Sequence, residues 1–248
     1  MLNNHNRVGK KTKENLPFRD PENPRILYKS SPRAKRISIK VRPSERDVIV
    51  NVPGSKALNK ARAFVQQQKD WIEIQLEALP PPQPFEAGRE ILFMGEMYQL
   101  QHQAGRGHPY VDHQSRTIQI PAPPDAFAAR TKRFLIREAR RQLTESTQYY
   151  ADQLDKEVEK ISVRDTSSRW GSCISREDKG YISYSWRLVC GPDFVLDYVA
   201  AHECAHMIEP NHSRAYWAVV ESIFPDFKQA KQWLNKNGAR LHAVGAAY

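Results

Sequence analysis

The sequence contains few cysteines and no long apolar run. Its 248 residues include only three cysteines, Cys173, Cys190 and Cys204, and none of them forms a C-x-x-C pair. This set argues against a disulfide framework and against a zinc site built from cysteines, and it is typical of a reducing compartment. No run of 18 apolar residues is present, so we expect no membrane-spanning segment.

The N-terminus lacks the features of a secretory signal and is strongly basic. It has neither an apolar segment nor a small-residue cleavage site, so we expect a cytoplasmic protein. Residues 1–46 contain 13 Lys or Arg against 4 acidic residues, whereas the rest of the chain is nearly balanced. We predict a disordered basic arm over residues 1–24. Such an arm is suited to contact nucleic acid or another acidic surface, and equally to keep the chain solvated.

Alternating apolar and polar residues predict strands in the first half of the chain. Residues 37–41 and 48–52 alternate on either side of a turn, which predicts a hairpin. Residues 55–79 have helical periodicity and end at three consecutive prolines. Residues 90–102 and 110–120 suggest three further short strands. We therefore expect residues 25–120 to form a β-rich N-terminal part with one long helix.

The proline-rich segment 121–124 is the clearest boundary, and we predict a second domain over residues 121–248. Residues 125–157 predict a long helix, and residues 161–165 and 180–189 predict strands. The long helix has a basic face that could be a solvated surface or a site for an acidic ligand. That face consists of Arg130, Lys132, Arg133, Arg137, Arg140 and Arg141.

A histidine motif in the next predicted helix carries the chemistry. The helix starts near Pro192 and contains H-E-x-x-H as His202, Glu203 and His206. Residues four apart on a helix differ by about 40° around the axis and about 6 Å along it, so both imidazoles can reach one ion. Glu203 faces the same side and is placed to take a proton from a metal-bound water.

A zinc ion in a catalytic site takes three protein ligands and leaves the fourth position to water. His212 follows six residues after His206, at the start of another predicted helix that Ser213 can cap. Glu221 on that helix is a competing third ligand or a partner that orients a histidine. The motif with its third histidine predicts a zinc site of His202, His206 and His212, with Glu203 as the catalytic base.

Three segments around this motif resemble a known family. They are SRWGSC at 168–173, YISYSWRL at 181–188 and DYVAAHECAHMIEPNHSRAYW at 197–217. Together they resemble the YgjP-like metallopeptidase family, which looks like a relative of the zincin-type and SprT-like peptidases. The resemblance implies an α+β fold in which a zincin-like helical core with a short sheet follows a small β-rich part. It also implies Zn²⁺ bound by His202, His206 and His212, with Glu203 as the base. The substrate is not carried over from the family, and we expect a peptide or a protein.

Other residues are candidates for binding the substrate. Arg169 could stabilise an oxyanion or could instead pin a loop. Tyr216 and Arg214 lie within one turn of His212 and are candidates for polarising a carbonyl. The strand at 181–188 is the candidate sheet edge for pairing with a substrate strand.

The sequence leaves the substrate open. A metal-activated water would also serve a hydrolase of a nucleotide phosphoanhydride, with the basic face at 130–141 holding phosphates. A protease associated with nucleic acid through the basic arm is another alternative. A nucleic-acid-binding module with a purely structural zinc site is the third, but it has no use for Glu203.

Overall fold

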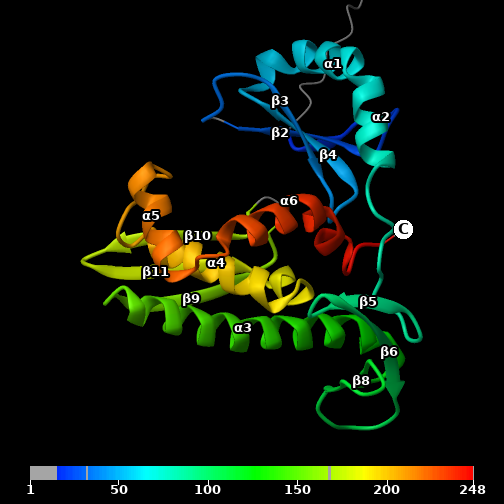
Figure 1. Ribbon diagram of the computed structural model, residues 1–248. Helices are drawn as coiled ribbons and strands as arrows, with labels where there is room; N and C mark the ends of the chain where they lie inside the picture. The colour runs from blue at the N-terminus through cyan, green and yellow to red at the C-terminus, as the bar shows by residue number, and fades with distance from the viewer. Residues whose placement is uncertain (1–15, 32, 167–168, 248) are drawn as a thin grey trace, which may run out of the picture. The chain divides into compact units, whose positions relative to one another are not determined.

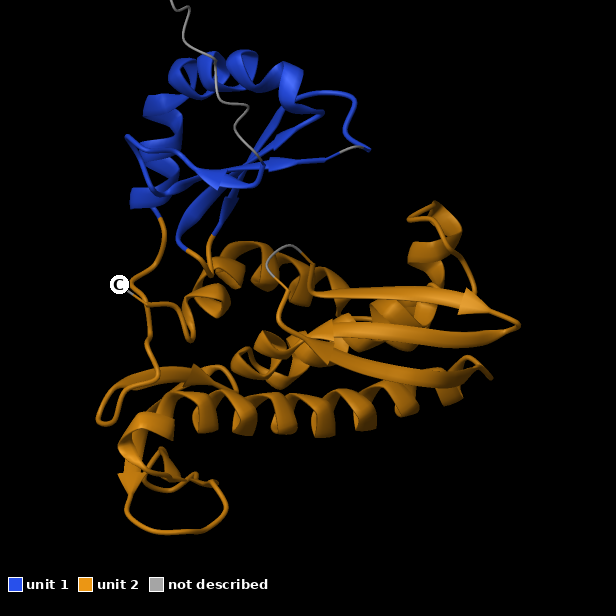
Figure 2. Cartoon of the chain, turned by 180° about the vertical axis from the view of Figure 1, so that it is seen from behind, with its two compact units in different colours: residues 1–42, 46–78 blue, residues 43–45, 79–248 orange. Residues whose placement is uncertain are grey.

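The computed structural model describes residues 16–31, 33–166 and 169–247. These residues form two compact units (Figure 2). One unit comprises the described residues up to Arg42 and Arg46–Ala78, and the other comprises Pro43–Glu45 and the described residues from Leu79 onward. The described residues contain six α-helices and three small sheets, each mixing parallel and antiparallel pairs. The predicted α+β class is therefore confirmed.

The first unit contains a four-stranded sheet with the order β1-β2-β4-β3. The predicted hairpin is the antiparallel pair β3–β4, and β2 pairs with β4 in parallel. Every second residue of β4 from Val48 is fully buried, as its alternating sequence requires. The strands are β1 (Phe18–Arg19), β2 (Ile26–Ser30), β3 (Ser38–Arg42) and β4 (Asp47–Val52).

The helical segment of the first unit is interrupted rather than continuous. A 3₁₀ turn, η1 (Ser55–Ala57), leads into α1 (Leu58–Gln67), and α2 (Lys69–Glu77) follows after a break at Gln68. The predicted single helix thus becomes two. It ends ahead of the prolines at 80–82, whose rings exclude a continuing helix.

The second unit starts with a four-stranded sheet in the order β5-β6-β8-β7, one strand more than the sequence suggested. Its backbone joins the rest of the unit directly, because the N–H groups of Met94 and Gly95 donate to the carbonyls of Val189 and Cys190 at 2.9 and 3.1 Å. The strands are β5 (Glu90–Phe93), β6 (Glu96–Gln103), β7 (Tyr110–Asp112) and β8 (Thr117–Pro121).

One hydrophobic core runs from these strands through the C-terminal helices. Ile91 and Leu100 from the sheet, Leu135 and Leu143 from the long helix, and Val199 from the motif helix belong to the same buried cluster. The second domain was predicted to begin at the proline-rich segment 121–124. The main division between the two units lies earlier in the chain, between Ala78 and Leu79.

The long helix α3 (Phe127–Gln153) follows a short 3₁₀ turn, η2 (Pro124–Ala126), and runs beside a three-stranded sheet (Figure 1). The strands are β9 (Glu157–Arg164), β10 (Gly171–Arg176) and β11 (Lys179–Ser185). Their order is β10-β11-β9, so β11 is the central strand. The prediction that residues 181–188 form a sheet edge is wrong, because β10 pairs antiparallel on one side of β11 and β9 pairs parallel on the other. The edge near the motif helix is β10.

The predicted strand at 180–189 also ends earlier than expected. Residues Trp186–Cys190 form a 3₁₀ helix, η3, in which every residue is buried. The sequence alternates apolar and polar residues through Leu188, but Trp186, Arg187 and Leu188 are all enclosed. Tertiary packing against α3 and β5 overrides the strand pattern here.

Three helices complete the second unit: α4 (Asp193–Ala205), α5 (Arg214–Ile223) and α6 (Phe227–Ala243). α4 packs on α3, β10, α5 and α6, which places it at the centre of the unit (Figure 1). Among the described residues, no helix is long and apolar enough to cross a membrane. All three cysteines are free thiols, and Cys204 is fully buried as a small core side chain.

Candidate metal centre

Two of the three predicted metal ligands lie at the C-terminal end of the motif helix α4. Pro192 is its N-cap and Asp193 lies in its first turn, where a carboxylate interacts favourably with the helix dipole. Nine of the thirteen α4 residues are buried, so the helix is held by packing on nearly all sides. His202 lies in the last turn and His206 is the C-cap. Both imidazoles therefore project from the rigid end of a buried helix.

The chain turns back after α4 and delivers His212 to the same place. Ser213 is the N-cap of α5, as predicted, and its Oγ accepts a hydrogen bond from the Tyr216 N–H at 3.2 Å. His212 directly precedes this cap, so the start of α5 fixes its position.

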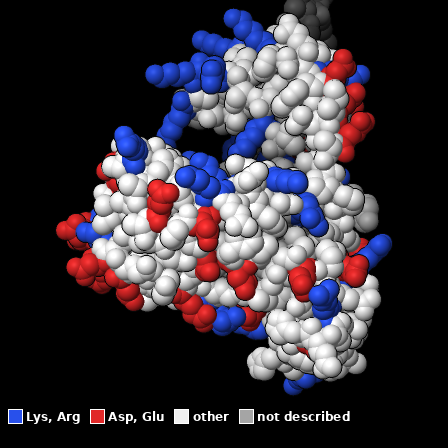
Figure 3. Space-filling view, viewed as in Figure 1, with Lys and Arg blue, Asp and Glu red and all other residues white. Residues whose placement is uncertain are grey.

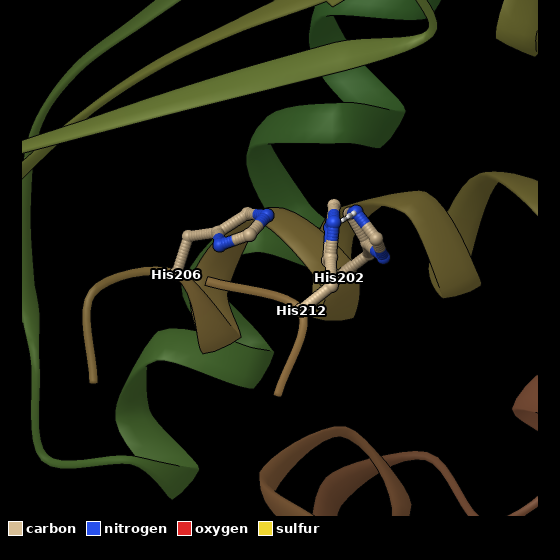
Figure 4. Close-up of side chains that lie close together, drawn as sticks. All are labelled: His202, His206 and His212. Carbon is tan, nitrogen blue, oxygen red and sulfur yellow. Dashed lines mark hydrogen bonds between the residues drawn. The ribbon is translucent and has the colours of Figure 1, made fainter. Parts of the chain in front are cut away.

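The three imidazoles converge as one group (Figure 4). One ring nitrogen from each of His202, His206 and His212 lies within 4.8 Å of the others. The Nε2 atoms of His202 and His212 are 3.2 Å apart. Ligands of a tetrahedral zinc ion with bonds of about 2.0–2.1 Å lie about 3.3 Å from one another. The donor set and its spacing thus fit a metal with nitrogen ligands.

The surroundings favour the neutral form of His202 and His206, which is the form that binds metals. Burial lowers the pKa of His202 from 6.5 to about 3, and His206, His212 and Lys231 add to the effect. Burial also lowers the pKa of His206, while its Nδ1 lies 3.2 Å from the Glu209 carbonyl. That contact fixes the ring orientation and leaves Nε2 of His206 for a metal.

Glu203 is a buried carboxyl group beside the histidines. The residue is only 4% exposed, and burial raises its pKa from 4.5 to about 8, while Arg169 opposes the rise. Gly171 at the start of β10 makes room for it. A Cβ at this position would lie 2.7 Å from both Cγ and Cδ of Glu203. The strand backbone thus encloses the carboxyl from one side.

Glu203 and the histidines line an open cavity of about 900 Å³, here called the metal cavity. Its walls come from α4, α6 and the segment from Arg169 to Ser175, which includes the edge strand β10. Arg169 is exposed and lines this cavity. The sequence-predicted Arg169, Glu203 and histidines are therefore brought to one cavity.

Tyr216 occupies a different place from the one its predicted role requires. It is fully buried, and its hydroxyl donates to the His202 carbonyl at 2.9 Å. Its ring stacks on His206, with centroids 4.5 Å apart. Tyr216 does not line the metal cavity. Tyr216 therefore holds His202 and His206 in position and does not face the cavity in which a substrate would bind.

Glu221, the competing third ligand, does not join the histidine cluster. Its carboxylate pairs with Lys228 at 3.7 Å, and both side chains are exposed. Among the described residues, the group that could hold a metal here is formed by the three histidines alone.

Two features of the cavity were not predicted from the sequence. One is the strand β10, which begins at Gly171 within the SRWGSC segment and brings Cys173 to the cavity wall. The other is Lys231, which reaches the cavity from α6. The glycine before a short alternating run was the available signal for β10, since glycine in a strand often marks a close approach. No local signal points to Lys231.

Three histidines that fit one metal ion, with a buried carboxyl beside them in an open cavity, define the site of a metal-dependent hydrolase. Residues 35–237 match the family model described as YgjP-like, metallopeptidase domain. The match covers most of the chain, so the chain belongs to this family, as the sequence resemblance indicated. No curated protein and no solved structure matches it significantly.

Proposed function

We propose that this protein is a zinc peptidase in which His202, His206 and His212 hold the metal and Glu203 is the catalytic base. The observation that carries the proposal is the buried Glu203 carboxyl beside three converging imidazoles in one cavity. Three neutral histidines are a ligand set that zinc prefers, and a fully structural site would have four protein ligands. When bound, zinc supplies a Lewis acid and lowers the pKa of its water to about 7.

Glu203 is suited to move a proton in both directions. Burial raises the pKa of this carboxyl above that of an exposed glutamate, and a base works best when its pKa lies near the operating pH. Glu203 takes the proton of the attacking water and returns it to the leaving amine. Its burial also limits exchange of that proton with bulk solvent.

The edge strand β10 is the proposed docking line for the substrate. It is hydrogen-bonded to β11 on one side only, and its residues line the metal cavity. An extended peptide added to this edge would gain main-chain hydrogen bonds and run past the histidines. Arg169, at the start of this segment, is placed to stabilise negative charge on the attacked carbonyl oxygen.

A substrate-binding test follows from this edge pairing. Peptides N-methylated at single amides along the chain should lose affinity at alternate positions, because only every second amide of an added strand faces its neighbour. Uniform tolerance of N-methylation would remove β10 from the proposal.

The alternative substrate, a nucleotide phosphoanhydride, loses the feature that favoured it. Arg130, Arg133 and Arg137 of the basic face line a separate cavity of about 310 Å³ with His108, and this cavity shares no residue with the metal cavity. None of the six residues of the basic face lines the metal cavity, so this face does not support a phosphate-bearing substrate at the histidines. Peptide hydrolysis is the function we retain.

The decisive experiment compares the wild type with Glu203→Gln on unfolded proteins, peptide libraries and nucleoside triphosphates. We expect both proteins to hold about one zinc per chain, and the variant to lose peptide hydrolysis by at least about 10²–10⁴-fold. Glu145→Gln, an equal charge change at an exposed site on α3, is the matched control. Undiminished peptide turnover by zinc-loaded Glu203→Gln, or turnover of triphosphates alone, would contradict the proposal.

The metal assignment has its own test. His212→Ala should lose most of the zinc measured by elemental analysis, because a two-histidine site binds it far more weakly. Full retention of zinc in His212→Ala would remove this residue from the ligand set.

A further inference from the structure

A second cavity lies on the flank of the metal cavity. This flanking cavity has a volume of about 740 Å³ and is lined by residues of α5 and α6. Lys231 and Asn235, both on α6, line the flanking cavity and the metal cavity alike. A chain bound at the histidines can therefore place a side group into the flanking cavity without leaving the surface of this unit.

The flanking cavity carries an excess of positive charge. Arg214, Lys228 and Lys231 line it together with one acidic residue, Glu221. Glu221 is already paired with Lys228 at 3.7 Å. Among the described residues, Arg214 has no ion pair or hydrogen-bond partner for its side chain, and no carboxylate pairs with Lys231. Two cations are therefore available to an anionic ligand.

Aromatic rings connect this charge to the metal centre. Phe227 stacks on Trp217 with ring centroids 5.3 Å apart, and Trp217 in turn stacks on His212 at 5.8 Å. The Lys231 ammonium lies over Trp217, 4.1 Å from its ring centroid. A cation–π contact of this kind holds the ammonium in place while leaving donors free for a ligand.

The charge is also visible on the surface of this unit. On the face shown in Figure 3, Lys and Arg atoms lie over the region of α5 and α6, with Asp and Glu atoms among them. Arg214, Lys228 and Lys231 are all exposed, so a ligand in solution can reach their charged groups.

We infer that the flanking cavity binds a carboxylate of the peptide substrate, with Arg214 and Lys231 as its donors. The inference rests on the proposed peptidase function and names the substrate class: peptides with an acidic group close to the scissile bond. The Arg214 guanidinium offers a planar fork that matches a carboxylate, and Lys231 offers a point charge between the two cavities. The carboxylate can come from an Asp or Glu side chain or from the peptide C-terminus.

The test measures binding and turnover separately. Dye-labelled, C-terminally amidated peptides carry Glu or Gln at one scanned position, and a third series carries Gln throughout with a free C-terminal carboxylate. Fluorescence anisotropy with the zinc-loaded full chain should show Glu preferred over Gln by about 10-fold at one or two positions. If instead the Gln series with a free C-terminus binds more tightly than the amidated Gln series, Arg214 and Lys231 bind the C-terminal carboxylate of the peptide.

The donors are tested by variants on the same helices. Arg214→Gln and Lys231→Met, which keeps an apolar contact with Trp217, should each reduce the carboxylate preference to less than about 3-fold. Lys236→Met removes the same charge from α6 at an exposed position that lines neither cavity, and it should leave the preference unchanged. Equal binding of the Glu, Gln and free-acid series at every position overturns the inference, and so does a preference that survives both cavity variants.

These outcomes are separable from the fate of the proposed function. Carboxylate-dependent binding that requires Arg214 and Lys231, without hydrolysis by the wild type, would retain the cavity assignment and reject the peptidase. Hydrolysis of Glu and Gln peptides with equal kcat/KM and equal affinity would retain the peptidase and reject the cavity assignment.

Discussion

At the scale of single residues, the site depends on a carboxyl group kept where charge is costly. Glu203 is enclosed by α4 behind it and by the backbone of β10 in front of it. Glycine is the residue that lets the strand approach so closely, because any Cβ at position 171 would overlap the Glu203 side chain. The absence of a side chain at Gly171 thus allows β10 to pack directly against the proposed base.

Gly171→Ala should therefore displace Glu203 without removing any chemical group. We expect a loss of about 1–3 kcal/mol in the free energy of unfolding and a clear fall in kcat, measured by urea unfolding and by peptide turnover. Gly54→Ala is the control, since a Cβ there meets no atom within 4 Å and its φ of 172° is ordinary extended backbone. Full activity of Gly171→Ala would mean that the carboxyl position is not critical.

A second residue-scale feature is the ion-pair cluster of Asp165. Its carboxylate accepts from Lys132 at 2.6 Å and from the buried Arg187. Burial by itself would raise the pKa of Asp165, but these two cations outweigh it and lower the pKa from 3.8 to about 2. Because the folded-state pKa is the lower one, the cluster stabilises the fold above pH 4. This stabilisation is lost as the pH falls through about 2.

Asp165→Asn should destabilise the protein at pH 7 by about 1–3 kcal/mol. This is less than the 3–5 kcal/mol of a fully buried pair, because Asp165 is partly exposed and screened by water. Urea unfolding at pH 7 and near pH 2 should show the difference from the wild type shrinking at the acidic end. Asp178→Asn, in the β10–β11 turn, is expected to be nearly neutral at both values. A pH-independent difference would contradict the electrostatic explanation.

At the scale of elements, the junction between α4 and α5 decides whether the third histidine reaches the other two. His212 has no helix of its own and lies immediately before the Ser213 cap. The cap fixes the first turn of α5, and Tyr216 in that turn holds the His202 carbonyl. The end of one helix and the start of the next are therefore tied together around the proposed metal.

Ser213→Ala should cost about 1 kcal/mol of stability, since it removes a side-chain N-cap, and should weaken zinc binding in a competition titration with a chelator. Ser213→Asp should restore both properties, because Asp is an equally good cap. Ser222→Ala, near the other end of α5, where Oγ donates to the Val219 carbonyl, is the control. Unaltered zinc affinity in Ser213→Ala would show that the cap does not position His212.

At the scale of the whole molecule, the chain separates into two units with their own hydrophobic interiors. The cluster that surrounds α4 consists entirely of residues from Ile91 to Val244. The first unit has a separate interior in which the sheet residues Tyr28 and Val50 are buried together with Ala61 and Ile72 of its helices. Every residue of the metal cavity belongs to the second unit. The disordered basic arm predicted over residues 1–24 is wrong for residues 16–24, because β1 (Phe18–Arg19) pairs with β2 and Arg19 forms an ion pair with Asp47 at 2.9 Å. Residues 1–15 lie outside the described residues, and for them the arm stays a prediction.

A fragment of residues 79–248 should therefore fold and bind zinc. We expect about one zinc per fragment and a cooperative thermal transition, because its core needs no residue of the first unit. Elemental analysis and calorimetry, with the fragment carrying His212→Ala as the zinc-free control, give the comparison. A fragment that is unfolded, or folded without zinc, would show that the first unit is required for the site.

The sequence by itself determined the local parts of the site. Helical geometry alone places His202, Glu203 and His206 on one side of α4, and a capping serine alone starts α5 after His212. The hairpin β3–β4 follows equally from alternation within a short segment. These features depend on neighbours along the chain, so residue spacing is sufficient to predict them.

Only the tertiary structure decided which strand borders the cavity and what encloses the base. β9 pairs with β11, although β10 lies between them in the sequence. Nothing in the sequences of the three strands specifies that order. Residues 186–188 look like strand but form a buried 3₁₀ helix because α3 and β5 enclose them. Gly171 contacts Glu203, and Lys231 lines the same cavity as the histidines. In both cases the residues are more than 18 positions apart in the sequence. Such contacts arise from packing between elements, which spacing along a single chain does not encode.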